Sequence, residues 1–169
     1  MRSRETDESC EATRRVLVIG YGNPLRGDDG LGQVIAERVA ETARPEAIGV
    51  IVAHQLTPEL VDPISRSDLV IFVDAAVDVP AGRIKVVPII ADAVEAPGAL
   101  GHHCCPAQLL AAAKRLYAHS PEAWAIVVGG ERWDYAESLS PAVEHLVPRL
   151  LHYIELLIAV RLPAEAGHA

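Results

Sequence analysis

Short apolar runs alternate with amphipathic segments along most of this chain. Continuous apolar runs predict strands buried on both faces, and they cover 16–20, 48–53, 68–75, 84–87 and 123–128. Apolar positions at helical spacing predict four helices: one from Leu31, a short one opened by Pro58, one over 106–117, and a long last one capped by Ser140. This alternation implies a mixed or mostly parallel sheet with helices on both faces.

The size of the chain fits one domain. It has 169 residues, enough for a sizeable core. We expect a single α/β domain over 15–162, a disordered extension over 1–14 and a frayed tail over 163–169. The formal net charge of −8 argues against nucleic acid and anionic membranes as partners, since both require a basic face.

Cysteine usage and the first residues indicate the compartment. The three cysteines are Cys10, Cys104 and Cys105, an odd number that forms no disulfide framework. The segment 1–15 lacks the apolar middle of a signal peptide, and no apolar run reaches the roughly 18 residues of a membrane span. We therefore expect a cytoplasmic protein with reduced thiols.

Acidic side chains follow two of the predicted buried strands. Asp28 and Asp29 come after the first strand, and Asp74 ends the third. His102 and His103 lie just before a predicted helix, in a loop that can reach the same edge. Because parallel strands share their carboxyl edge, these groups are expected to meet there. Two carboxylates and an imidazole suit a first-row divalent metal with positions left open.

Each of these residues also has a simpler interpretation. Asp28 can cap the following helix, Asp29 can favour the helix dipole from the first turn, and Asp74 can be a turn residue. A histidine pair in a polar loop is more often solvated than ligating. The adjacent cysteines fit one buried and one partly exposed thiol better than a metal site, and a cysteine nucleophile beside a histidine is a weaker alternative.

The glycine-rich turn after the first strand does not fit a phosphate site. A dinucleotide fingerprint would require glycine where Leu25 stands, and no Walker pattern occurs. The expected role of Gly20, Gly22 and Gly30 is to shape the loop by allowing tight turns and close backbone approach. Asn23 is expected to hold this loop through side-chain hydrogen bonds.

Several segments resemble the hydrogenase maturation proteases, the endopeptidases that finish the large subunit of nickel–iron hydrogenases. The segment Gly20–Gly32 (GYGNPLRGDDGLG) is similar to the opening motif of that family. The likeness continues, in the same order along the chain, at Val73-Asp74-Ala75, at His102–Leu110 with its Pro-x-x-Leu-Leu helix, and at Leu139-Ser140-Pro141. The resemblance spans about residues 15–160.

The resemblance implies a fold, a reaction and a set of site residues. The fold would be a three-layer α/β/α sandwich around a twisted, mostly parallel five-stranded sheet. The activity would be removal of the C-terminal extension from a nickel-loaded large-subunit precursor, in which the nickel is borne by the substrate. By position, Asp29, Asp74 and His102, with His103 as fallback, would bind the metal. Asp29 and Asp74 would be catalytic, with Asp28 a general base or a supporting residue.

Alternatives to this assignment remain open at the level of sequence. An aspartate-based mechanism without catalytic metal fits the same residues. A divalent-metal hydrolase of a small substrate would need a self-sufficient ligand set. A non-catalytic chaperone for nickel or for the large subunit would bind without cutting. A monomer is the expected oligomeric state.

Overall fold

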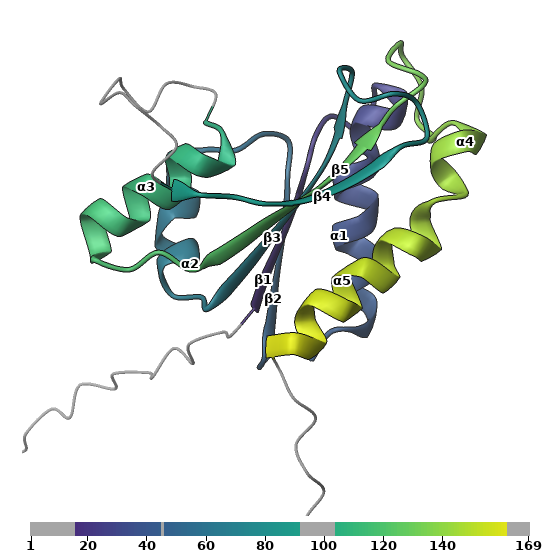
Figure 1. Ribbon diagram of the computed structural model, residues 1–169. Coiled ribbons are helices and arrows are strands. Elements are labelled where there is room, and N and C mark those ends of the chain that lie inside the picture. The colour runs from purple at the N-terminus through teal and green to yellow at the C-terminus, as the bar shows by residue number, and fades with distance from the viewer. Residues whose placement is uncertain (1–15, 45, 92–103, 162–169) are drawn as a thin grey trace, which may run out of the picture.

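Five strands form one mostly parallel sheet at the centre of the molecule (Figure 1). The computed structural model describes residues 16–44, 46–91 and 104–161. The strands are β1 (Val16–Tyr21), β2 (Ile48–Ala53), β3 (Leu69–Ala76), β4 (Ile84–Pro88) and β5 (Glu122–Gly129). Their order is β2-β1-β3-β5-β4, with β4 alone antiparallel, at one edge. The predicted strands are confirmed to within one residue at each end.

Helices cover both faces of this sheet, which confirms the predicted three-layer α/β/α arrangement (Figure 1). The helical elements are η1 (Gly27–Gly30), α1 (Leu31–Thr42), η2 (Pro58–Leu60), α2 (Val61–Ser65), α3 (Pro106–Tyr117), α4 (Pro141–Glu144) and α5 (Val147–Arg161). One face packs against α1 and α5, and the opposite face packs against α2 and α3. Within the described residues, no helix has the length and apolar character needed to cross a membrane.

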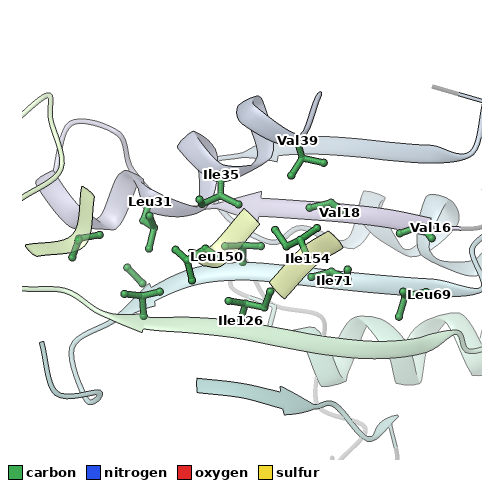
Figure 2. Close-up of a cluster of buried hydrophobic side chains, with 14 residues drawn as sticks. Val16, Val18, Leu31, Ile35, Val39, Leu69, Ile71, Ile126, Leu150 and Ile154 are labelled. Carbon is green, nitrogen blue, oxygen red and sulfur yellow. The ribbon is translucent and has the colours of Figure 1, made fainter. Parts of the chain in front are cut away.

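The alternation of side chains along β1 builds both cores. Val16 and Val18 pack toward α1 and α5, whereas Leu17 and Ile19 pack toward α2 and α3, because successive strand residues point to opposite faces. Figure 2 shows the first of these clusters. The four residues expose at most 1% of their surface, and burying an aliphatic side chain of this size contributes about 1.5–3 kcal/mol. The sheet is therefore a rigid frame for the loops at its ends.

The last helix differs from the prediction. Instead of one long helix, α4 ends at Glu144 and α5 begins at Val147. Pro148 explains the break, because proline has no N–H and its ring clashes with the carbonyl four residues earlier, which here belongs to Glu144. The expected cap is confirmed: the Ser140 side chain accepts a hydrogen bond from the backbone N–H of Val143 at 3.4 Å.

The order of the strands places a topological switch between β1 and β3. From β1 the chain passes to β2 on one side and then returns to β3 on the other side of β1. Open α/β sheets bind ligands at the carboxyl ends of the two strands that flank such a switch. Here Tyr21 closes β1, and Asp74 lies near the end of β3.

Candidate active site

Asp29 and Asp74 come together at this switch point. Asp29 belongs to η1, the short turn of 3₁₀ helix between β1 and α1. Asp74 lies two residues beyond Phe72, which packs toward α2 and α3, so its side chain leaves β3 on that same face. The two carboxylates are close enough for the charge of Asp29 to raise the pKa of Asp74. The structure therefore places two of the candidate site residues from the sequence near each other.

Asp74 has an unusual proton affinity for a carboxyl group. Burial raises its pKa to about 6, and the negative charge of Asp29 acts in the same direction. Two hydrogen bonds oppose this rise, one from the Tyr21 hydroxyl and one from the backbone N–H of Ala75, which donates to Oδ1 at 2.8 Å. A carboxyl group with a pKa near neutrality can take up and release a proton at physiological pH. Such a shift is typical of functional sites.

Tyr21 is a site residue that the sequence interpretation missed. Its ring packs beside the α2/α3 core, on the same face as Asp74, and its hydroxyl forms the hydrogen bond to that carboxylate. Burial and the charge of Asp74 raise the pKa of Tyr21, so its hydroxyl remains a neutral donor. The available signal was the alternation along β1, which puts Tyr21 on the face of Leu17 and Ile19.

The adjacent cysteines lie at the start of α3, on the same side of the sheet. Cys104 is half-buried, Cys105 is exposed, and neither forms a disulfide bond. Cys105 caps the helix: its backbone N–H donates to Oε1 of Gln108 at 2.9 Å, and its side chain accepts from the Gln108 backbone. It is near enough to Tyr21 for a charged sulfur to raise the pKa of that tyrosine. The exposed thiol therefore lies near Tyr21, the residue that bonds Asp74.

Asp28 is placed differently from its neighbour Asp29. Its carboxylate is fully buried and accepts four hydrogen bonds, from the backbone N–H groups of Glu131, Arg132 and Ser140 and from the Ser140 hydroxyl. Burial alone would raise its pKa, but these four donors outweigh it and hold the pKa below the ordinary value. A carboxylate so engaged is a poor general base, because a proton would displace hydrogen bonds that it already accepts.

The loop that carries Asp29 is shaped by close backbone contacts. Gly22 has a φ of +133°, and a Cβ there would collide with the carbonyl oxygen of Asp29. The backbone N–H of Asn23 donates to Oδ2 of Asp29 at 3.0 Å, and Oδ1 of Asn23 accepts from the N–H of Leu25 at 3.0 Å. A Cβ on Gly30 would lie 2.9 Å from Cα of Pro24. These contacts fix the path of the loop around Asp29.

Two further contacts join this loop to the sheet. Gly20 approaches α1 so closely that a Cβ would collide with the carbonyl oxygen of Gly32. The nearly buried Gln33 donates from Nε2 to the carbonyl oxygens of Gly22 at 2.7 Å and Ala53 at 2.9 Å. Gln33 thereby holds the ends of β1 and β2 together, a role for which the sequence offers no signal.

The two histidines nominated from the sequence, His102 and His103, lie outside the described residues. Across 16–44, 46–91 and 104–161, no group of three His, Cys, Asp or Glu side chains is arranged to hold a metal ion. Among the described residues, Asp29 and Asp74 are two carboxylates that lie near each other at this edge of the sheet. Carboxylate oxygens are ligands that divalent metals accept in proteins.

The arrangement can perform acid–base chemistry. Two carboxyl groups are close, and burial raises the pKa of Asp74 to about 6, a value that suits a group exchanging protons in a reaction. Asp74 can take or return a proton near neutral pH, whereas Asp29 supplies a negative charge beside it. Hydrolysis of a polarised carbonyl is within reach of such a pair.

No family model and no curated protein matches this sequence, but solved structures resemble it. The hydrogenase maturating endopeptidase HybD from E. coli superposes with a TM-score of 0.72 and 22% identity, over 86% of this chain and 93% of that one. The [NiFe] hydrogenase maturation protease HycI from Thermococcus kodakarensis KOD1 superposes with a TM-score of 0.68 and 21% identity, over 88% of this chain and 94% of that one.

A third neighbour is the hydrogenase 2 maturation peptidase from Thaumarchaeota archaeon SCGC_AB-539-E09. Its TM-score is 0.64 at 21% identity, over 87% of this chain and 99% of that one. These identities are low, and what the likeness establishes is the architecture. The chain has the fold that these hydrogenase maturation endopeptidases share.

Proposed function

We propose that this protein is a hydrogenase maturation endopeptidase, which removes the C-terminal extension of a nickel-loaded nickel–iron hydrogenase large-subunit precursor. One observation carries the proposal: Asp29 and Asp74 meet at the switch point of a sheet whose fold is that of such endopeptidases. The opening segment Gly20–Gly32, which resembles the family motif, supplies the first of these two carboxylates.

The proposed site recognises the nickel that the precursor carries. Carboxylate oxygens from Asp29 and Asp74 would occupy positions that the precursor's own ligands leave open on the ion. His102 is proposed as the third protein ligand, with His103 as the alternative. Since recognition then depends on a metal delivered by the substrate, a precursor without nickel would present no ligand for the two carboxylates.

The two carboxylates also account for the hydrolytic step. In the form of the mechanism in which Asp74 is not bound to the nickel, its carboxylate accepts a proton from a water molecule as the water oxygen adds to the scissile carbonyl carbon. The same carboxyl group then returns that proton to the amide nitrogen as the C–N bond breaks, releasing a carboxylic acid and an amine. The Asp29 carboxylate raises the basicity of Asp74 throughout. We propose that the protein acts as a monomer in the cytoplasm.

The deciding experiment compares nickel-loaded and nickel-free precursor as substrates, with cleavage followed by intact-protein mass spectrometry. Wild-type protein should release one short peptide from the loaded form and leave the nickel-free form intact. Asp29→Asn and Asp74→Asn should each lose processing, whereas Asp78→Asn, on an exposed carboxylate just beyond β3, should retain it. Equal cleavage of both precursors would discard nickel recognition, and full activity of both site variants would discard the carboxylate assignment.

The same preparation separates the two alternative functions. A metal hydrolase of a small substrate should retain stoichiometric metal after treatment with a chelator. A chaperone should bind the loaded precursor without shortening it, and Asp74→Ala should weaken that binding. The proposed endopeptidase should do neither, because its metal comes with the substrate and its complex ends in cleavage.

A further inference from the structure

Two loops far apart in sequence are bonded to each other beside the carboxylate pair. We call residues 22–30 the site loop and residues 130–140, between β5 and α4, the distal loop. The backbone N–H of Gly27 donates to the carbonyl of Ala136 at 2.9 Å, and the N–H of Ala136 donates to Leu25 at 3.1 Å. The N–H of Asp28 donates to the carbonyl of Arg132 at 2.9 Å. The distal loop therefore lies alongside the site loop and is bonded to it backbone to backbone.

The Asp28 carboxylate is the centre of this contact. All four of its donors belong to the distal loop: Glu131 N at 2.7 Å, Arg132 N at 2.9 Å, Ser140 N at 2.6 Å and Ser140 Oγ at 2.8 Å. Asp28 is wholly shielded from solvent, and Ser140 exposes 3% of its surface. Hydrogen bonds to an ionised acceptor in such surroundings are short and strong. Together they fix the orientation of the backbone at Asp28.

Because Asp28 and Asp29 are consecutive residues of η1, fixing the direction of the Asp28 side chain also fixes that of the Asp29 side chain. In a 3₁₀ helix, three residues make one turn, so consecutive side chains project about 120° apart. When the side chain of Asp28 is held against the distal loop, that of Asp29 must leave the helix in a different direction, where its Oδ2 accepts from the N–H of Asn23 and its charge acts on Asp74. Any rotation of η1 about its axis that freed Asp28 would also turn Asp29 away. The N–H of Asn23, bonded to Oδ2 of Asp29 at 3.0 Å, would lose its acceptor in that case.

We propose that Asp28 and Ser140 are positioning residues that hold Asp29 beside Asp74. This proposal rests on the proposed peptidase function. Ser140, more than 100 residues away in sequence, then controls the rate of the chemical step without touching substrate.

The test uses three variants in the full chain and one matched control. Ser140→Ala removes one of the four donors to Asp28, Ser140→Thr keeps a hydroxyl at the same place, and Asp28→Asn removes the charge. Ser138→Ala alters an exposed serine of the same loop that contacts Arg132 and not Asp28. Processing of nickel-loaded precursor is measured well below the melting temperature of every variant, so that each is fully folded.

Positioning predicts losses in kcat rather than in KM. We expect kcat to fall about tenfold in Ser140→Ala and at least a hundredfold in Asp28→Asn, with KM changed less than twofold. Ser140→Thr and Ser138→Ala should stay within twofold of wild type. A purely structural anchor would lower the melting temperature of these variants yet leave kcat unchanged once they are folded, and that result would overturn the proposal. If Asp28→Asn does not fold, the pair Ser140→Ala and Ser140→Thr decides.

Hydrogen exchange gives a readout that does not depend on activity. If Asp29 loses its direction in Ser140→Ala, the amide of Asn23 should exchange at least tenfold faster, whereas the amide of Ile19 in β1 should be unaffected. If the wild-type protein cleaves no precursor, the proposed function fails. The exchange rate of the Asn23 amide then tests the positioning role by itself. An unchanged exchange rate of the Asn23 amide in Ser140→Ala would then overturn the positioning role of Ser140. Faster exchange of that amide would support it.

Discussion

Replacing Asp74 by Asn should make the protein more stable at neutral and alkaline pH, although it removes a proposed catalytic group. Asp74 is held in a place that disfavours its charge: burial raises its pKa to about 6 from an ordinary value of 3.8, and Asp29 adds to the effect. The folded state therefore binds the proton more tightly than the unfolded state. The free energy of unfolding must fall as the pH rises from about 4 through about 6, and it stays lower above that range.

The size of the effect follows from the pKa. Each unit of difference between folded and unfolded states is worth about 1.4 kcal/mol, so the rise from 3.8 to about 6 corresponds to about 3 kcal/mol at pH 8. Asparagine keeps an oxygen for the Ala75 N–H, but its hydrogen bond with Tyr21 is weaker than that of a carboxylate, which offsets about 1 kcal/mol. The net gain is about 2 kcal/mol, or about 4–8 °C in melting temperature for a chain of this length.

Urea unfolding at pH 4 and pH 8 measures this gain directly. Asp74→Asn should be stabilised at pH 8 and much closer to wild type at pH 4, where the carboxyl group of the folded state is protonated. Asp78→Asn, on the exposed turn after β3, should show no such difference. If Asp74→Asn is less stable than wild type at pH 8, or if its free energy of unfolding changes equally at both pH values, the ionised Asp74 carboxylate does not destabilise the folded state and the reasoning is refuted.

Three other substitutions, two of them paired with a control substitution, test the geometry. Tyr21→Phe should lower the processing rate about tenfold while stability changes by about 1 kcal/mol or less, and Tyr153→Phe, whose hydroxyl bonds an exposed arginine on α5, should process normally. Gly32→Ala should cost about 3 kcal/mol in urea unfolding, because its Cβ would meet backbone carbonyls of β1 and β3. Gly82→Ala, with open space but a φ of +74°, should cost only about 1 kcal/mol. Asp28→Asn should lose stability near pH 7 and much less below pH 4, because the hydrogen bonds that lower its pKa stabilise the fold only while it is ionised.

The strands were readable from sequence because each is a continuous apolar run between turn residues. The same pattern predicted that Asp29 and Asp74 would share an edge, since parallel strands end on one side of the sheet. The break after Glu144 was also encoded locally, in Pro148, but the long apolar pattern concealed it. For these features, the information lies within a few residues along the chain.

The division of roles between Asp28 and Asp29 was not readable in this way. Both are acidic, adjacent and at the start of a helix, so only the family resemblance, which placed Asp29 at the metal and Asp28 in a supporting or general-base role, separated them. Only the folded chain brings Ser140 and the distal loop onto Asp28, and only burial beside Tyr21 changes the proton affinity of Asp74. These properties arise from contacts between residues that are distant along the chain.

The sequence by itself thus determined the architecture and the edge at which the acidic groups gather, because hydrophobic periodicity and strand direction are local properties. The tertiary structure decided which carboxylate is locked by hydrogen bonds, which one faces its partner, and which one holds a proton near neutral pH. The physical reason is that hydrogen-bond partners, burial and neighbouring charges are fixed only when loops from opposite ends of the chain pack together.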